Sequence, residues 1–381
     1  MIKFLALISP LAFMAATSMA LPATAGTAGT APAVDGSDIV SAANAFISSL
    51  DANQRKQVLY AFDDNAQRAR WSNFPAGVVP RGGISFKQMS ALQRAAAMKL
   101  LATVFSPMGL RKINEIRQAD DDFKVSGSKR GSGGPGGRGG QPPPGAPGGP
   151  GAQGPPGQRP GFSPGDLFGS DLYSISFLGR PSTAAPWMLQ FGGHHLALNT
   201  SFAGGTGVMT PSLTGAQPAS FILDGRTVRP LGRESDKALA LLQSLDEKQR
   251  KQAVLDYAVP DLVLGPGQDG KKIVPEGLKA SSMTAPQQAL LLDVIVEWAG
   301  IINDRSAAAR MAEMKVDLNL TWFAWSGPTT APAGTNITGY YRIQGPHLVI
   351  EYAPQKDEPN NHVHTIYRDP TNDYGRAATK Q

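Results

Sequence analysis

The sequence contains no cysteine among its 381 residues. Disulfide partners, cysteine zinc sites, iron–sulfur clusters and thiol nucleophiles are therefore excluded. Charged residues are also scarce, at 17%, whereas hydrophobic residues make up 41% of the chain. This apolar fraction is too large for a wholly disordered chain and can supply a sizeable core, and the length fits two domains or two structural halves.

Well-known catalytic signatures are missing as well. The sequence has no His-Glu-x-x-His and no Walker loop. Residues 161–165 match Gly-x-Ser-x-Gly and residues 265–270 match Gly-x-Gly-x-x-Gly, but neither match lies between a predicted strand and a predicted helix, as a nucleophile elbow or a dinucleotide fingerprint requires. Motifs of this kind therefore do not identify a reaction, and the function has to be sought in other residue patterns.

The N-terminus has the three-part pattern of a secretory signal peptide. Lys3 precedes an apolar run over residues 4–17, and small residues follow. Cleavage after Ala20 or after Ala25 fits this pattern, and we take residues 1–25 as the signal and 26–36 as a flexible mature N-terminus. The run is shorter than the roughly 20 apolar residues of a membrane span. We therefore expect export to the periplasm or the medium, with no membrane span after cleavage.

Residues 126–165 form an insert of unusual composition, with 16 glycines and 10 prolines in 40 residues. This segment cannot bury enough apolar surface to offset its chain entropy, so we predict that it is disordered. It also carries four basic residues and no acidic one, which is most of the formal charge of +6. The remainder is close to neutral, and we expect no nucleic-acid partner.

Two helix-forming segments occur twice in the chain. SLDANQRKQVLYAF, from Ser49, reappears as SLDEKQRKQAVLDYA from Ser244, and a second helix repeats in the same way about 195 residues later. Each copy begins with a capping box, in which the N-cap and N3 side chains bond to free backbone N–H groups. The boxes are Asp51 with Gln54, Ser90 with Gln93, Asp246 with Gln249, and Thr284 with Gln287.

A β-hairpin follows each helical pair. In residues 187–199 side chains of inward and outward type alternate on both sides of Gly192-Gly193. Residues 340–352 show the same alternation on both sides of Gly345-Pro346. We therefore predict an α+β fold made of a duplicated unit, a helical pair followed by antiparallel hairpins. The predicted units are residues 37–230, interrupted by the insert, and 231–375, with a flexible tail at 376–381. Two such units usually pack about a pseudo-twofold axis, where equivalent residues can meet.

All five histidines lie in the predicted strand blocks. The repeat aligns His195 with His347 and Asn199 with Glu351, while the alternation of a strand puts His362 and His364 on one face. Imidazoles and a carboxylate in this pattern are typical ligands of a divalent transition metal such as zinc or copper. The candidate ligands are His195, His347, Glu351, His362 and His364. A metal-free polar cleft and structural histidines bonded to backbone remain alternatives.

Polar residues in two other segments are candidates for substrate chemistry. After the last strand, Asp369 or Asp373 could act as a general base, and Arg368 could hold an anionic group. The alternative for this tail is a turn whose Asp side chains bond local backbone. The loop before Gly83 carries Trp71 and Arg81, which could bind a small polar ligand, although Trp71 could equally cap the core.

These residues lead to two functional hypotheses. The first is an exported metal-dependent enzyme, a hydrolase, with the metal in a histidine-rich cleft between the repeats. The second is a non-catalytic small-ligand-binding protein of the periplasm or cell surface that uses the same cleft. A copper-storage role is disfavoured because methionines do not cluster near the histidines.

Several motifs in order resemble one known family. They are WSNFP followed by RGGI, WMLQFGGHHL, TPSLTGAQP, YYRIQGPHLVIEY and HVHTIYRDPTNDYG. Together they resemble the family catalogued as domain of unknown function 3500, over roughly residues 37–375. The resemblance implies a shared fold and no particular chemistry. The Gly/Pro insert departs from the family pattern, which indicates that it is dispensable for the fold.

Overall fold

The computed structural model describes residues 36–130 and 167–379. The predicted signal peptide and most of the predicted insert lie outside these described residues. Within them, no helix is both long enough and apolar enough to cross a bilayer.

The predicted helices are present in both halves of the chain. All four predicted capping boxes form, so this local prediction is confirmed. The first-half helices are α1 (Gly36–Ser49), α2 (Ala52–Val58), α3 (Asn65–Arg68), α4 (Ala91–Val104) and α5 (Pro107–Arg130). The second-half helices are α7 (Gly232–Ser244), α8 (Glu247–Ala253), α9 (Ala285–Ala299), α10 (Asp304–Val316) and α11 (Arg376–Thr379). Residues 126–130, which we assigned to the insert, thus continue α5, and α11 lies in the predicted tail.

The strands form one continuous twelve-stranded sheet and a separate small hairpin. Along the sheet the order is β1-β3-β4-β5-β7-β14-β13-β12-β11-β10, with β2 beside β3 and β6 beside β5. The first-half strands of the sheet are β1 (Leu59–Tyr60), β2 (Ile84–Ser85), β3 (Ser174–Leu178), β4 (Trp187–Gly193), β5 (Leu196–Ala203), β6 (Thr206–Val208) and β7 (Ser212–Ala216). The second-half strands are β10 (Leu278–Lys279), β11 (Trp322–Ser326), β12 (Tyr340–Gly345), β13 (Leu348–Pro354) and β14 (Val363–Arg368). The small hairpin is β8 (Phe221–Leu223) with β9 (Arg226–Val228).

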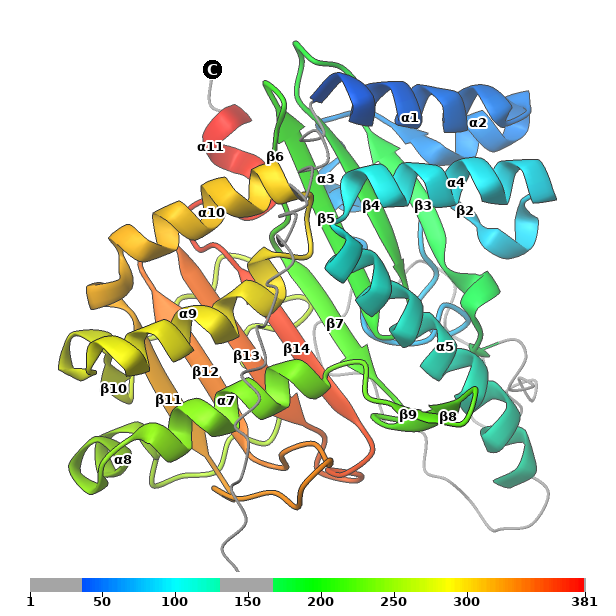
Figure 1. The fold of residues 1–381 in the computed structure, drawn as a ribbon. Helices are drawn as coiled ribbons and strands as arrows, with labels where there is room; N and C mark the ends of the chain where they lie inside the picture. Colours follow the sequence, from blue (N-terminus) through cyan, green and yellow to red (C-terminus); the bar gives the residue numbers. More distant parts are fainter. Residues whose placement is uncertain (1–35, 131–166, 380–381) are drawn as a thin grey trace, which may run out of the picture. The chain divides into compact units, whose positions relative to one another are not determined.

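The two halves join where β7 pairs with β14. The pairing is antiparallel and puts Thr214 opposite Thr365, with their hydroxyl oxygens 2.7 Å apart. This junction lies in the middle of the sheet, with the first-half strands on one side and the second-half strands on the other (Figure 1).

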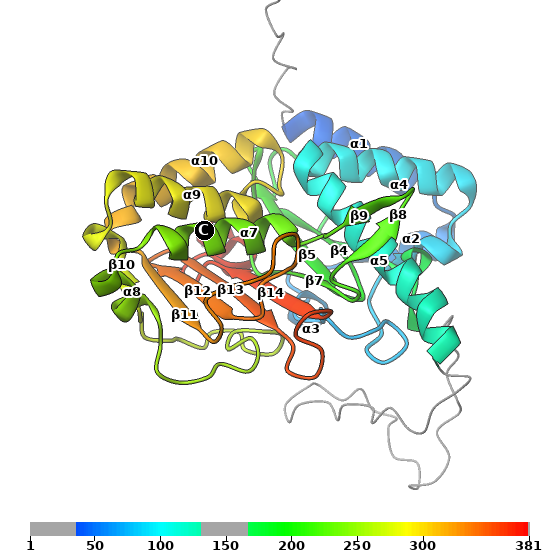
Figure 2. The same cartoon turned by 60° about the horizontal axis from the view of Figure 1, so that its bottom comes forward.

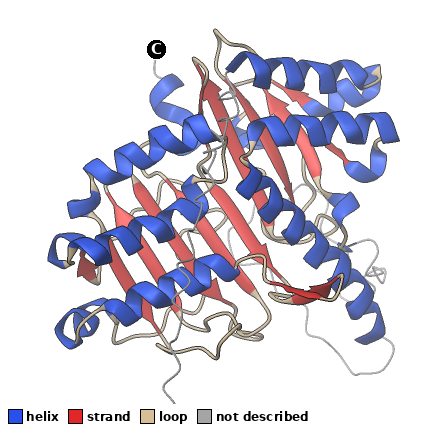
Figure 3. Cartoon of the chain, viewed as in Figure 1, coloured by secondary structure: helices blue, strands red, loops and turns tan. Residues whose placement is uncertain are grey.

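The sheet is covered differently on its two faces. The long helices α1, α4, α5, α7, α9 and α10 lie on one face, whereas loops and the short α3 lie on the other (Figures 2 and 3). Alternate residues of β4 follow this division: Leu189 packs in the large core, and Met188 in a smaller cluster with Trp71. Both faces are therefore buried, which explains why the strands have few exposed positions.

Polar side chains on the loop-covered face are bonded to one another and to the loops. Gln190 donates to the side chain of Asn199 and to the backbone oxygen of Arg68, at 2.9 and 3.0 Å. Glu351 accepts from the backbone N–H groups of Val263 and Leu264 at 2.9 and 2.8 Å. Buried polar groups need such partners, so these bonds fix the two loops on the sheet.

A buried charge cluster on the helix-covered face links the halves. Lys112 of α5, 5% exposed, lies between Glu234 of α7 and Glu297 of α9, which are both fully buried. Its ammonium group donates to the Glu234 carboxylate, and to the backbone oxygen of Glu297 at 2.7 Å. From the second half, Arg233 and Lys237 also pair with Glu297, at 2.9 and 2.6 Å.

Both predicted hairpins form, but their turns lie one or two residues later than predicted. Gly193 pairs with Leu196, so the first turn is His194-His195, and the second is Pro346-His347. Gly192 and Gly193 are required because neighbouring atoms pack closely against them, and they do not form the turn. A Cβ on Gly192 would lie 2.6 Å from the oxygen of Leu196, and one on Gly193 would lie 2.7 Å from the Tyr173 ring.

Candidate metal centre

Three of the predicted ligands meet at the junction of the halves. His195 lies in the β4–β5 turn, His362 immediately precedes β14, and His364 lies on β14. Nε2 of His362 is 2.9 Å from Nε2 of His195 and 3.0 Å from Nε2 of His364. One nitrogen of each ring lies within 4.8 Å of the others, so this triad could hold a metal ion.

Two backbone hydrogen bonds fix His195, and the absence of a side chain at Gly215 leaves room for its ring. Its φ of +57° is left-handed, a conformation that costs about 1–3 kcal/mol in a non-glycine residue. Its N–H donates to the oxygen of Asn73 at 3.2 Å, and its own oxygen accepts from Gly215 at 2.7 Å. A Cβ on Gly215 would lie 3.2 Å from the His195 ring. The left-handed conformation belongs to the tight β4–β5 turn, and together with the space left by Gly215 it places this imidazole at the junction of the halves.

The spacing of the three nitrogens suits a transition metal. Zinc–nitrogen bonds of about 2.0–2.1 Å place two tetrahedral ligands roughly 3.4 Å apart, about 0.4–0.5 Å more than the two shortest nitrogen–nitrogen separations here, so a small outward movement of the rings would fit the ion. Three protein ligands leave a fourth position for water or substrate, as in catalytic zinc sites. Imidazole ligands also suit copper, iron and nickel, so the donor set alone does not select one ion.

Burial keeps His195 and His362 in the form that binds metals. Burial, reinforced by the neighbouring imidazoles, lowers the pKa of His362 to about 2. The same causes hold the pKa of His195 well below its ordinary value. Both rings are therefore neutral at neutral pH, with nitrogen lone pairs available for coordination.

Stability of the metal-free protein should consequently fall in mild acid. In the unfolded chain an imidazole protonates near pH 6.5, whereas in the folded chain His195 and His362 resist protonation. Below pH 6.5 the unfolded state binds more protons, so each ring lowers the free energy of unfolding by about 2 kcal/mol at pH 5. Urea unfolding at pH 7.5 and pH 5, with a chelator present, measures this effect. His362→Gln should remove about half of the pH dependence, and a wild-type midpoint that is unchanged between these pH values would contradict it.

Two polar residues from the covering loops lie beside the triad. The amide nitrogen of Asn73 is 3.3 Å from Nε2 of His364, and the carboxylate of Asp261 is 3.7 Å from Nδ1 of the same ring. Burial alone would raise the pKa of Asp261, but the nearby His364 ring, the side-chain amide of Gln355 and the backbone N–H of Leu262 outweigh burial and lower it. The side chain of Asp261 is 56% exposed, so this edge of the triad faces solvent.

A second histidine–carboxylate pair lies behind the triad. The ring of His194 packs against that of His195, with centroids 3.6 Å apart. Nδ1 of His194 is 2.6 Å from the carboxylate of Asp120 on α5. Asp120 therefore fixes His194, and His194 in turn confines the ring of His195.

The other predicted ligands lie elsewhere. His347 is 46% exposed in the β12–β13 turn, where its ring meets Thr371 at 2.8 Å and Asp317 at 3.7 Å. Glu351 is fully buried and also accepts from the Tyr340 hydroxyl at 2.6 Å. The expectation that His195 and its repeat partner His347 meet at the junction is wrong.

The predicted proton-transfer residues have internal partners instead. Asp369 lies about 16 Å along β14 from His364, given about 3.3 Å per residue. Its carboxylate accepts from Thr371 at 2.7 Å and pairs with Arg310 at 2.9 Å. Asp373 accepts from the Asp369 N–H and pairs with Arg368, both at 2.9 Å. These bonds match the alternative interpretation of this tail as a self-bonded turn.

The predicted ligand-binding residues are likewise engaged. Arg368 donates to Leu264 and Asp269 at 2.7 and 2.9 Å, while Arg81 donates to four backbone oxygens, including that of Gly193 at 2.9 Å. Trp71 donates to the Tyr374 hydroxyl at 2.8 Å and is largely buried.

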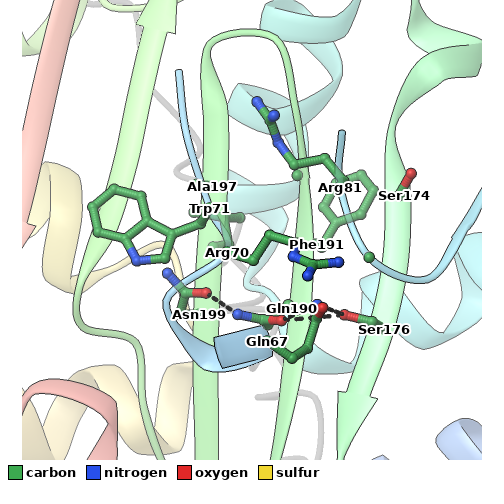
Figure 4. Close-up of a pocket in the computed structure, with 13 residues that line it drawn as sticks. Gln67, Arg70, Trp71, Arg81, Ser174, Ser176, Gln190, Phe191, Ala197 and Asn199 are labelled. Atoms are coloured by element: carbon green, nitrogen blue, oxygen red, sulfur yellow. Dashed lines mark hydrogen bonds between the residues drawn. The ribbon is translucent and has the colours of Figure 1, made fainter. Parts of the chain in front are cut away.

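Trp71 and Arg81 do line a small polar pocket with Gln67 and Gln190 (Figure 4). Arg81 points away from the two amides. The pocket measures about 20 Å³, which is room for about one water molecule.

Sequence reasoning did not select Asn73, Asp120, His194 or Asp261 for the site. His194 adjoins a selected residue, and Asn73 lies within the selected loop. Asp120 and Asp261 carry no local signal, because only the long-range packing of α5 and of the second loop brings them to the histidines.

The described chain is thus an α+β protein with one continuous sheet and a three-histidine group that could hold a metal ion. Over residues 33–376 it matches the family model described as protein of unknown function (DUF3500), and it belongs to this family. The resemblance found in the sequence motifs is therefore confirmed. No curated protein and no solved structure matches the chain.

Proposed function

We propose that the protein is a metal-dependent hydrolase whose divalent metal is bound by His195, His362 and His364. The convergence of three ring nitrogens carries the proposal: those of the buried His195 and His364 and of the partly buried His362, with His195 coming from a distant part of the chain. Chance contact is a poor explanation, because His195 occupies an unfavourable backbone conformation above a glycine that leaves space for its ring.

A metal in this position would supply two kinds of chemistry. Such an ion would polarise a substrate oxygen, or would lower the pKa of a bound water so that the water could act as a nucleophile at neutral pH. His195, His362 and His364 would hold the ion, and Asp261 marks a solvent-exposed edge of the site. We assign no catalytic step to Asp369 or Asp373, because their carboxylates are occupied by internal bonds.

Metal analysis and hydrolysis assays test the proposal together. Protein purified without a histidine tag should contain about one zinc or copper ion per chain by mass spectrometry, or gain one on titration. A panel of chromogenic esters, phosphoesters and peptides should include a substrate whose turnover stops with a chelator and returns with the metal. Protein that neither contains nor gains a metal would refute the proposal.

The second candidate function is a non-catalytic binding protein for a small polar or anionic ligand. A hollow of about 280 Å³ favours it, lined by Asn65, Arg68, Ala69, Asp269, Tyr374 and Arg376. Two guanidinium groups in one hollow suit a carboxylate or phosphate group. This function would be favoured over the first if ligand binding were unaffected by a chelator and no substrate were turned over.

We also propose that the protein is exported and that its two halves arose by duplication about a pseudo-twofold axis. Export is supported by the charged, apolar and small-residue segments of residues 1–25. Duplication is supported by the matching registers of the hairpins, in which Gln190 faces Asn199 and Arg342 faces Glu351. It is further supported by the antiparallel pairing of β7 with β14.

A further inference from the structure

We infer that Asp261 is a positioning residue of the metal centre, whose carboxylate orients the His364 ring so that Nε2 faces the ion. The inference rests on the proposed function, since it concerns the same three-histidine site. It adds Asp261, a residue of the loop between α8 and β10 that is not among the residues predicted from the sequence.

The amide nitrogen of Asn73 lies near both nitrogens of His364, 3.3 Å from Nε2 and 3.5 Å from Nδ1, but the imidazole and carboxylate neighbours of the two nitrogens differ. Nε2 is 3.0 Å from Nε2 of His362, whereas Nδ1 is 3.7 Å from the carboxylate of Asp261. An imidazole that binds a metal through Nε2 carries its proton on Nδ1, and it almost always donates that proton to a carboxylate, a carbonyl or water. Asp261 is the carboxylate on the required side, and a movement of less than about 1 Å would form the hydrogen bond.

Asp261 is also held in place, although half of its side chain is exposed. Its Oδ1 accepts from the Leu262 N–H at 2.7 Å and from the side-chain amide of Gln355 at 2.9 Å. The backbone N–H of Gln355 in turn donates to the backbone oxygen of His362 at 2.8 Å. Gln355 therefore ties the carboxylate to the segment that carries two of the three imidazoles.

Such outer partners typically contribute 10-fold to 100-fold to metal affinity. We expect Asp261→Ala to weaken Co²⁺ binding by 10-fold to 100-fold. Asp261→Asn should weaken it by about 10-fold, because the amide oxygen can still accept a hydrogen bond from Nδ1–H of His364 but carries no charge. Gln355→Ala should weaken binding by a smaller factor, because it frees the carboxylate without removing it. Asp256→Asn, a substitution at an exposed position of the same loop, is the matched control and should bind as wild type does.

The test is a Co²⁺ titration of the full chain, followed by visible absorption, with circular dichroism to confirm folding. Asp261 variants that bind Co²⁺ within threefold of wild type would overturn this inference and leave the proposed metal site intact. A wild-type chain that binds no Co²⁺ or Zn²⁺ would overturn both. Equal weakening by Asp256→Asn would show a nonspecific charge effect and would also overturn the inference.

Discussion

Replacing His195 with alanine is expected to weaken Zn²⁺ binding at least 100-fold, whereas replacing His347 with alanine should leave it unchanged. His195 supplies one of three converging nitrogens, and two imidazoles cannot replace a three-ligand site. His347 occupies the equivalent place in the sequence repeat, but its ring faces Thr371 and Asp317. Competition with a chromogenic chelator measures both affinities.

The comparison is stringent because the two substitutions are chemically identical. His195→Ala removes a buried ring and could lower stability, so His195→Gln, which keeps more of the volume, accompanies it. Equal affinities of His195→Gln and His347→Ala for Zn²⁺ would contradict the assignment. Loss of binding in His362→Ala and His364→Ala would complete the ligand set.

Replacing Lys112 with methionine should lower the free energy of unfolding by about 3–5 kcal/mol. Methionine keeps most of the side-chain volume but removes the charge between two fully buried carboxylates. Glu297 retains Arg233 and Lys237, so Glu234 is the group left without a cation. The urea midpoint at pH 7.5 reports the change.

Two further variants isolate the electrostatic cause. Lys99→Met, at an exposed position of α4, should leave the free energy of unfolding within about 0.5 kcal/mol of the wild-type value. Adding Glu234→Gln to Lys112→Met should recover part of the loss, because the unpaired charge is then gone. A Lys112→Met midpoint close to wild type would show that the cluster contributes little to stability.

The helices could be predicted because their signals are local. Each capping box involves residues three positions apart, and all four boxes form as the sequence indicates. The hairpins were also predictable from alternation. Their turns were misplaced because Gly192 and Gly193 look like turn residues, whereas close packing against Leu196 and Tyr173 is what requires them.

The candidate metal centre could be predicted only in part, because the register between distant strands cannot be read from the sequence. Alternation correctly groups His362 and His364 on one face of a strand. The repeat, however, aligns His195 with His347 and therefore predicts both as ligands. In the first half Leu196 is opposite Thr214, so the turn carries His195 to the centre of the sheet. In the second half Val349 is opposite Arg368, so His347 lies beyond the end of β14. The register between strands that are distant in the sequence cannot be predicted from the residues of either strand alone.

Long-range partners explain the other differences. Arg81 and Arg368 look like binding residues because the sequence does not reveal the backbone oxygens of Gly193 and Leu264 that they contact. Asp369 and Asp373 accept hydrogen bonds from the backbone of their own segment, as in the turn predicted as the alternative for this tail.

His195 and His362 are separated by 167 positions in the chain, so the proposed ligand set is complete only after His364 has been synthesised. Under the proposed function, a nascent chain without His362 and His364 could not capture the ion, and metal loading would follow tertiary folding. For a chain that folds after translocation, the metal supply of the destination compartment, rather than that of the cytosol, would decide which ion is acquired.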